Sequence, residues 1–302
     1  MTTWQIQLSP HDTFDEWHPY ARYLLNQKIP PHQVVWQTQG TDDLFAGNNS
    51  EQQITPELTA DVQGNESRQR VNKHFIPLAK YACCHQNPQR FQRLYQLLWR
   101  LVYEEGKLLT NVTDDDVHQV SQWAKAVARD RHKMKAFVRF RQLQFRDINS
   151  ASGQKEMYVA WFEPSHYIVK LTADFFCDRF TNMDWSILTP YQSIHWLDKK
   201  LFVTGGSDKN QIPVEDELEE HWRTYYSSIF NPARLKVKAM CAEMPKKYWH
   251  NLPEASLIKP LTEQAEQAKQ AMLNQTPTET RLPQQTKFNR RDWLDKKHSV
   301  TQ

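Results

Sequence analysis

The pattern of apolar and polar positions changes its period several times along the chain. Residues 4–8 alternate between apolar and polar, as a half-buried strand does. Residues 12–27 place apolar side chains on one helical face, and residues 34–36 are apolar and β-branched or aromatic. Residues 1–37 therefore predict a small β-α-β unit.

A polar segment separates this unit from the rest of the chain. Residues 38–66 are rich in Gln, Asn, Gly, Thr and Asp, which is typical of a loop or linker. Apolar residues at helical spacing then predict three helices in succession, near residues 68–85, 88–104 and 115–133. The second of these follows Pro88, a residue that suits the first turn of a helix.

The period then changes to two, which indicates strands. Residues 157–163 and 166–171 flank Pro164-Ser165 and predict a hairpin, and a helix follows near residues 172–182. Further strands are expected at residues 135–146, 185–189, 192–197 and 200–203. We expect these strands to form an antiparallel sheet.

Helical patterns return after the strands. They predict helices at residues 214–230 and 232–243, a short turn around Tyr248 and a polar helix up to Leu273. Residues 275–302 are rich in Pro, Gln, Thr and Lys and predict a disordered tail. The fold class is therefore α+β, an antiparallel sheet flanked by helices, with residues 67–274 as the main domain.

Composition removes several classes of function. The 302 residues include only seven glycines, which argues against Gly-rich phosphate loops. The four cysteines form no CxxC pair, so we expect no metal site and no cofactor. No signal peptide and no long apolar segment is present, so we expect a cytoplasmic protein without membrane contact.

The net charge of +3 is small, but the cations cluster. Residues 129–141 contain six cations and a histidine against one acid, at a predicted helix-to-strand junction. Such a run neutralises nucleic-acid phosphates, or it is a solvated face over a core strand. The candidate nucleic-acid contacts in this run are Arg131, Lys133, Lys135, Arg139 and Arg141.

A second basic cluster surrounds Asn231-Pro232, a good N-cap and first-turn pair. The free N–H groups of such a helix start can bind phosphate, although an ordinary capped helix with a basic surface has the same pattern. The candidate contacts here are Arg223, Arg234, Lys236 and Lys238, and Trp249 is a candidate for supporting an unstacked base.

The sequence holds no complete catalytic motif. The weak candidates for acid–base chemistry are His195, Glu163 and Tyr225, which all fall in the dense aromatic and polar block between residues 129 and 256. A polar or core role is the default for each of these side chains.

Several segments resemble one uncharacterised bacterial domain of DNA repair or DNA metabolism. That domain occurs fused to UdgX-type uracil-DNA glycosylases, or alone beside a radical-SAM partner. The segments that carry the resemblance are FDEWHPYARYLLNQKIPPHQVVWQ (14–37), HKMKAFVRFR (132–141), YVAWFEPSHYIV (158–169), FFCDRFTNMDWSILTP (175–190) and HWRTYYSSIFNPARLKVKAMCAEMPKKYWHNLPEA (221–255).

The resemblance implies a DNA-repair setting and no mechanism. We expect neither uracil excision nor radical-SAM chemistry, because both need iron–sulfur clusters held by suitably spaced cysteines. The leading hypothesis is a DNA-binding accessory module for a uracil-DNA glycosylase-like or radical-SAM enzyme. The alternatives are an enzyme acting on a damaged or modified base, and a protein-interaction adaptor that does not touch DNA.

Overall fold

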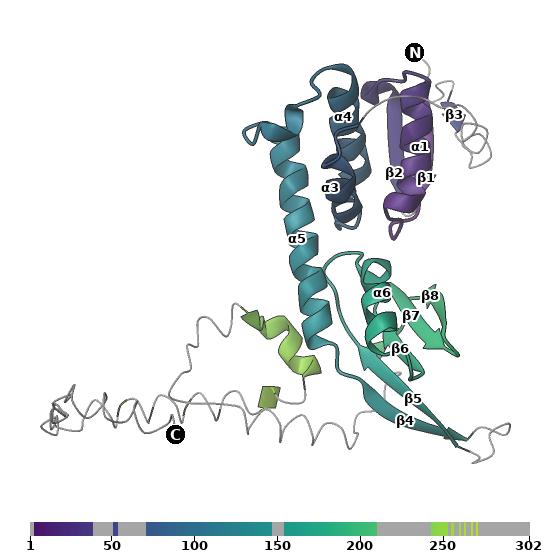
Figure 1. Ribbon diagram of the computed structural model, residues 1–302, viewed down its shortest axis with the longest axis vertical. Coiled ribbons are helices and arrows are strands. Elements are labelled where there is room, and N and C mark those ends of the chain that lie inside the picture. The colour runs from purple at the N-terminus through teal and green to yellow at the C-terminus, as the bar shows by residue number, and fades with distance from the viewer. Residues whose placement is uncertain are drawn as a thin grey trace, which may run out of the picture.

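The computed structural model describes residues 3–38, 51–53, 71–146, 154–209 and 243–252, with isolated positions between 255 and 270 (Figure 1). The helices are α1 (Phe14–Asn26), α3 (Phe75–Ala82), α4 (Arg90–Tyr103), α5 (Asp115–Phe137) and α6 (Val169–Arg179), with short turns η1 (Pro31–Gln33), η3 (Leu108–Thr110) and η6 (Lys246–Asn251). The strands are β1 (Thr3–Leu8), β2 (Val34–Thr38), β3 (Glu51–Gln53), β4 (Arg141–Arg146), β5 (Gln154–Trp161), β6 (Trp185–Leu188), β7 (Gln192–Leu197) and β8 (Lys200–Gly205).

The N-terminal β-α-β unit is confirmed. β1 pairs in parallel with β2, and α1 connects them and buries its apolar stripe, including Trp17 and Leu24. Thr13 and Glu16 form a capping box at the start of α1. β3 pairs with the other side of β1, so the segment predicted as a loop at residues 38–66 contains a strand.

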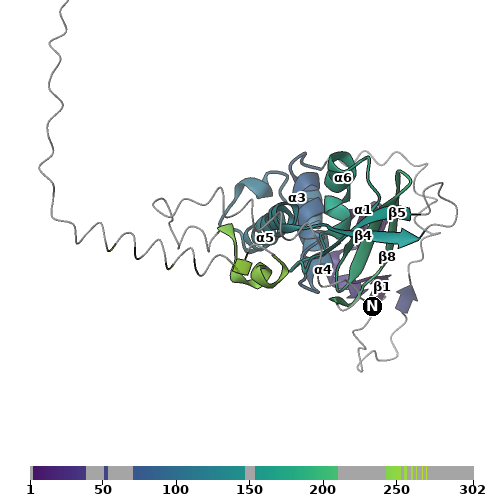
Figure 2. The ribbon, with the colours of Figure 1, turned by 90° about the horizontal axis from the view of Figure 1, so that it is seen from below.

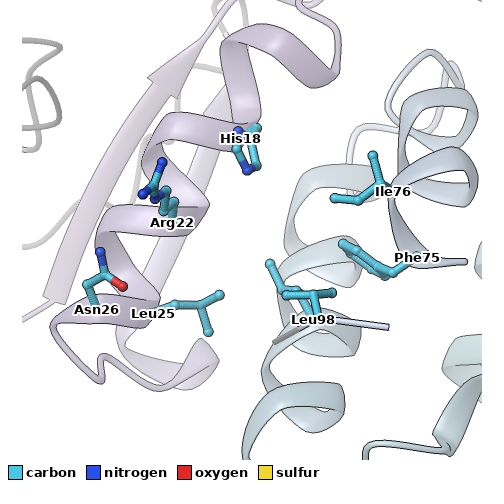
Figure 3. Close-up of a pocket in the computed structure, with 8 residues that line it drawn as sticks. His18, Arg22, Leu25, Asn26, Phe75, Ile76 and Leu98 are labelled. Carbon is cyan, nitrogen blue, oxygen red and sulfur yellow. The ribbon is translucent and has the colours of Figure 1, made fainter. Parts of the chain in front are cut away.

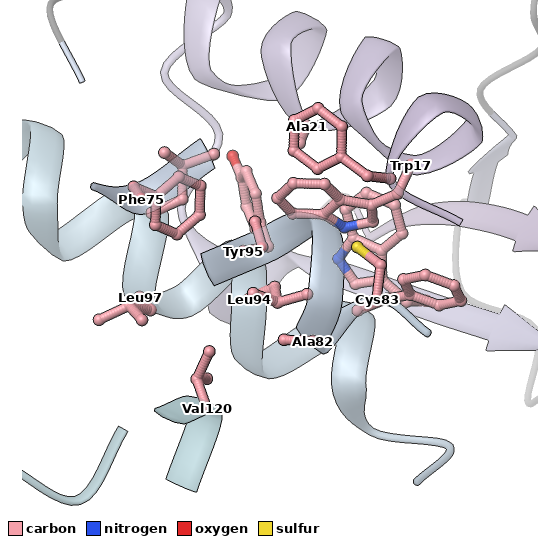
Figure 4. Packing of buried hydrophobic residues seen from close by; sticks show 14 of the residues in the cluster. Trp17, Ala21, Phe75, Ala82, Cys83, Leu94, Tyr95, Leu97 and Val120 are labelled. Carbon is pink, nitrogen blue, oxygen red and sulfur yellow. The ribbon is translucent and has the colours of Figure 1, made fainter. Parts of the chain in front are cut away.

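The N-terminal core forms where α1, β1 and β2 pack against α3, α4 and the beginning of α5. Figure 4 shows Trp17, Tyr95 and Leu94 close together at its centre. The Tyr95 hydroxyl donates a hydrogen bond of 2.6 Å to the carbonyl oxygen of Ile29, which satisfies the polar end of a fully buried ring. The three predicted helices are present as α3, α4 and α5, but α3 is shorter than predicted, and α5 continues to Phe137, into residues predicted as the start of a strand.

Arg90 lies at the boundary of this core and is only 1% exposed. Its guanidinium donates hydrogen bonds to the carbonyl oxygens of Cys83 (2.6 Å), Asn87 (3.2 Å) and Pro10 (2.7 Å). It also lies over the ring of Tyr167, at 5.1 Å from the centroid. One buried cation thus joins the end of β1, the α3–α4 connection and the segment before α6.

Helix α5 links the two halves of the fold (Figure 1). It begins at Asp114, whose carboxylate accepts the N–H groups of Asp116 and Val117 at 3.1 Å each. Its 23 residues span about 34 Å. Its first turns pack into the N-terminal core, whereas Val127 and Met134 belong to a second, C-terminal core with α6, the larger sheet and η6.

The larger sheet has the strand order β4-β5-β6-β7-β8. The predicted strands at residues 185–189, 192–197 and 200–203 are confirmed as β6, β7 and β8. The prediction of a purely antiparallel sheet is wrong, because β5 and β6 pair in parallel. A parallel pair needs a crossover, and α6 supplies it.

The predicted hairpin around Pro164-Ser165 is therefore also wrong. Residues 166–168 lead into α6 instead of forming a returning strand. The N–H groups of Ser165 and His166 bind the buried carboxylate of Asp130, so neither group is free for a strand partner.

α6 packs on one face of the larger sheet, where Trp185, Ile187 and Ile194 are fully buried. Both views place η6 beside the C-terminal half of α5 (Figures 1 and 2). The predicted helices at residues 214–230 and 232–243 and the predicted tail at 275–302 lie almost wholly outside the described residues. Within those residues, no helix combines the length and the apolar character needed to cross a membrane.

Candidate nucleic-acid interface

Asp130 of α5 is the centre of a buried polar cluster. One carboxylate oxygen accepts the N–H groups of Ser165 at 2.7 Å and His166 at 2.9 Å. The other accepts the Tyr248 hydroxyl at 3.0 Å, and the ammonium of Lys247 lies 3.9 Å away. Burial raises the pKa of Asp130, while the hydrogen bonds from Tyr248, His166 and Ser165 and the charge of Lys247 oppose that rise. One carboxylate thus joins three segments that are distant in sequence.

A stack of rings lies beside this cluster. The imidazoles of His85 and His166 stack with centroids 4.5 Å apart, and His85 also stacks on Trp123 at 5.3 Å. The Nδ1 atom of His166 accepts the N–H of Gln86 at 3.3 Å, and that of His85 accepts the N–H of Asn87 at 3.1 Å. Both Nδ1 atoms are acceptors, so each neutral ring carries its proton on Nε2.

Both histidines are held in the neutral form. Burial, followed by the positive charges of Lys247 and Arg129, lowers the pKa of His166 to about 4. Burial, followed by the neighbouring His166 and Arg90, lowers the pKa of His85 to about 4. These rings therefore present N–H donors and no charge at neutral pH.

Cations lie on the two elements that meet at Asp130, with Arg129 on α5 and Lys246 and Lys247 on η6. Arg129 and Lys246 are exposed, and the described part of the chain gives neither of them an acidic partner. The Lys247 side chain is 47% exposed and donates a hydrogen bond to the Ser165 hydroxyl. We call this region, made of Arg129, Ser165, Lys246, Lys247 and His250, the Asp130 surface. Its outward groups are ammonium, guanidinium and hydroxyl, which all bind anions.

Two carboxylates limit the positive charge of the region. Glu243 pairs with Lys133 at 3.1 Å, and Glu163 lies 3.3 Å from Nε2 of His250. Glu163 also accepts the indole N–H of Trp161 at 2.7 Å. Burial raises the pKa of Glu163, but the hydrogen bonds from Trp161 and His250 outweigh this effect, and the net direction is downward. Glu163 therefore favours the carboxylate form, which suits a structural partner better than a general acid.

The structure separates the predicted cations of residues 129–141. Arg131 donates a hydrogen bond of 2.7 Å to the Tyr81 hydroxyl, and Lys135 lies over the Phe175 ring at 4.2 Å from the centroid. These two side chains are four residues apart and share one face of α5. Lys133 contacts Glu243 beside η6, on a different face. The run is therefore not a single basic patch.

The other predicted contacts lie elsewhere. Arg139 donates to the carbonyl oxygens of Ala136 and Val138 at the end of α5. Arg141 begins β4, where it pairs with Val159. Trp249 donates its indole N–H to the carbonyl of Met244 at 2.9 Å, and its ring is partly buried against the C-terminal core. The remaining candidates lie outside the described residues: Arg223, Tyr225, Arg234, Lys236 and Lys238.

His195 lies in a polar row across three strands. Its Nδ1 is 2.7 Å from the hydroxyl of Ser186, and its Nε2 is 2.9 Å from that of Thr204. Burial lowers the pKa of His195. Ser186 is only 2% exposed, so this serine is a poor nucleophile for any substrate from solvent. Among the described residues, no hydrogen bond or ion pair joins His195 to Glu163.

Sequence reasoning missed the residues that organise the surface. Neither Asp130 nor the lysine pair Lys246-Lys247 was singled out as functional. A signal was present in each case. Asp130 is the one acid within a run of cations, and such an isolated acid is often a buried acceptor. The two lysines directly precede Tyr248 and Trp249, which anchor their turn in the C-terminal core.

Comparison with curated proteins finds no match, and comparison with solved structures finds none. A comparison with protein families matches residues 88–254 to a domain of unknown function, DUF4130. This range contains α4, α5, α6, the larger sheet and η6, and it leaves out β1, α1, β2 and α3. More than half of the chain, including the whole Asp130 surface, therefore lies within the match, and the chain belongs to the DUF4130 family.

Proposed function

We propose that this protein is a DNA-binding accessory module of DNA repair or DNA metabolism, and that the Asp130 surface contacts DNA phosphates. The observation that carries the proposal is a set of exposed cations on two elements that the buried carboxylate of Asp130 joins: Arg129 on α5, and Lys246 and Lys247 on η6. Fixed cations lose little entropy when they bind a phosphate, and each phosphate contact releases counterions.

The repair setting rests on the family. Segments of this chain resemble the domain found with UdgX-type uracil-DNA glycosylases and radical-SAM proteins, and the chain is a DUF4130 member. The proposed partner is such an enzyme, which performs the chemistry in the cytoplasm while this module holds the DNA.

The direct test is fluorescence anisotropy with a labelled single strand, a duplex and a uracil-containing duplex of equal length, all at low salt. We expect binding that weakens steeply as salt increases. The double variant Arg129→Glu/Lys246→Glu should weaken binding at least tenfold. The matched control, Lys73→Glu/Lys107→Glu, makes the same change of charge at exposed lysines around the N-terminal core and should bind as the wild type does.

The result also separates the alternatives. Failure of the wild type to bind any of these nucleic acids, together with capture of the partner enzyme, would replace the proposal with a protein-interaction adaptor. Chemical change of a lesion-bearing strand by the chain alone, detected by mass spectrometry, would instead indicate an enzyme acting on a damaged or modified base.

A further inference from the structure

A second candidate site lies in the N-terminal half of the fold, and of its lining residues only Leu98 falls within the family match. A cavity of about 210 Å³ opens between α1 and the helices α3 and α4 (Figure 3). Its apolar wall consists of Leu25, Phe75 and Leu98, which are 5%, 1% and 4% exposed, together with Val71 and Ile76. Packed helices normally leave few voids of this size, so a cavity at this position is an unusual feature of the fold.

The opposite wall is polar and comes from one stripe of α1. His18, Arg22 and Asn26 are spaced by four residues, so their side chains lie above one another along the helix. Within the described part of the chain, none of the three side chains has a hydrogen-bond or ion-pair partner. His18 is fixed by stacking on Phe14, with centroids 5.0 Å apart and planes at 19°.

The polar wall carries positive charge and no negative charge. Burial, followed by the charge of Arg22, lowers the pKa of His18 against the opposing charge of Asp15, and this favours the neutral imidazole. Arg22 supplies a full positive charge, and none of the lining residues is acidic. The guanidinium, the amide and the imidazole together offer several N–H donors beside an apolar floor.

This combination defines the chemistry of a ligand. The apolar floor suits a ring or a short hydrocarbon chain, and the donors suit an oxyanion. A dry cavity of about 150 Å³ binds benzene, so this cavity has room for one ring with a short substituent. It is too small for a ligand of drug size, which needs at least about 300 Å³.

We propose that the cavity between α1 and α3 is a binding site for a small amphipathic anion, a single ring or short chain that ends in a carboxylate or phosphate. Arg22 pairs with the oxyanion, Asn26 and His18 add hydrogen bonds, and the apolar body lies against Phe75 and Leu98. The site is separate from the Asp130 surface and does not depend on DNA binding.

Isothermal titration calorimetry of the full chain with three probes tests this proposal. The probes are phenyl phosphate, 3-phenylpropionate and the uncharged 3-phenylpropan-1-ol. We expect at least one of the two anions to bind with a Kd at or below about 1 mM and at least about tenfold more tightly than the alcohol. The tighter of the two anions identifies the oxyanion as phosphate or carboxylate.

Two variants locate the binding. Arg22→Gln should reduce anion affinity at least about tenfold and leave the alcohol unchanged, because only the oxyanion contact is lost. Its matched control, Lys107→Gln, removes one exposed cation that does not line the cavity and should change nothing. Ile76→Trp fills the cavity and should abolish binding of all probes. Arg129→Glu/Lys246→Glu should bind the anions as the wild type does, whatever its effect on DNA.

Three results would overturn the proposal. The first is no binding of either anion at millimolar concentration, and the second is equal affinity for the anions and the alcohol. The third is unchanged anion affinity in Arg22→Gln. Because Arg22 is an exposed residue of a helix, this variant should fold and tests the oxyanion contact even if Ile76→Trp does not fold.

Discussion

The hydroxyl of Tyr248 donates a hydrogen bond of 3.0 Å to the buried carboxylate of Asp130, 118 residues earlier in the chain. The Tyr248 ring also stacks on Phe162, with centroids 5.2 Å apart and planes at 16°. Tyr248 thereby fixes η6 on α5 and on the end of β5. Lys246 and Lys247 precede it directly, so the Tyr248–Asp130 contact sets the position of the cations in the Asp130 surface.

Removal of this contact should lower stability and loosen the surface together. Tyr248→Phe keeps the stacked ring but leaves a buried carboxylate with one donor fewer, which costs about 1–3 kcal/mol. Chemical denaturation measures the loss, and hydrogen exchange at residues 246–251 should increase. Tyr23→Phe is the matched control, because Tyr23 is only partly buried and the described residues give its hydroxyl no partner. Equal stability of Tyr248→Phe and the wild type would contradict the role of Asp130 as an organising group.

Arg90 should be among the side chains to which the fold is most sensitive. Arg90→Met fills similar space but leaves the carbonyl oxygens of Cys83, Asn87 and Pro10 without their donor. We expect a loss of at least about 2 kcal/mol in the free energy of unfolding, because hydrogen bonds to a charged group contribute about 1.5–3 kcal/mol each. Arg93→Met removes a guanidinium that is 41% exposed and should cost far less. A similar loss in both variants would show that burial of Arg90 has no special role.

Stability should fall as the pH drops from about 6.5 towards 4. The folded pKa values of His85 and His166 are about 4, below the ordinary value of 6.5. The unfolded chain therefore binds more protons than the folded chain within this window, so acid favours unfolding. Protonation at Nδ1 would also displace the N–H groups of Gln86 and Asn87.

His85→Phe tests this pH dependence. The variant keeps a ring between Trp123 and His166 but cannot be protonated. The urea denaturation midpoint of each protein is measured from pH 7 down to pH 4 and compared with its own value at pH 7. As the pH decreases, the midpoint should fall less for the variant than for the wild type. Parallel declines of the two proteins would mean that His85 is not held neutral in the folded state.

The sequence predicts the N-terminal half of the fold better than the sheet. Helices such as α4 and the β1-α1-β2 unit have apolar residues at clear helical or alternating spacing, and each is largely decided by local pattern. Residues 166–171 alternate as a strand does, yet Val169–Leu171 start α6. The reason is tertiary, because Asp130, 35 residues before Ser165, binds the N–H groups of this turn.

For the charged residues too, the sequence does not reveal the tertiary contacts. The run at 129–141 identifies a basic element, but it cannot show that Arg131 and Lys135 contact Tyr81 and Phe175. Nor does the sequence show that Arg129 and Lys247 both act on His166, because Lys247 comes close to that ring only when η6 packs on α5. A cluster of cations in the sequence does not show which of them share a surface, because that depends on the helical face of each residue and on long-range contacts.

The salt dependence of DNA binding tests the central claim most directly. The logarithm of the binding constant should fall linearly with the logarithm of the salt concentration, by about 0.7–0.9 per phosphate contact. Arg129→Gln/Lys246→Gln removes two proposed contacts, so its slope should be shallower by about 1.4–1.8, whereas Lys73→Gln/Lys107→Gln should keep the wild-type slope. The same slope for both double variants and the wild type would contradict a phosphate-binding role for the Asp130 surface.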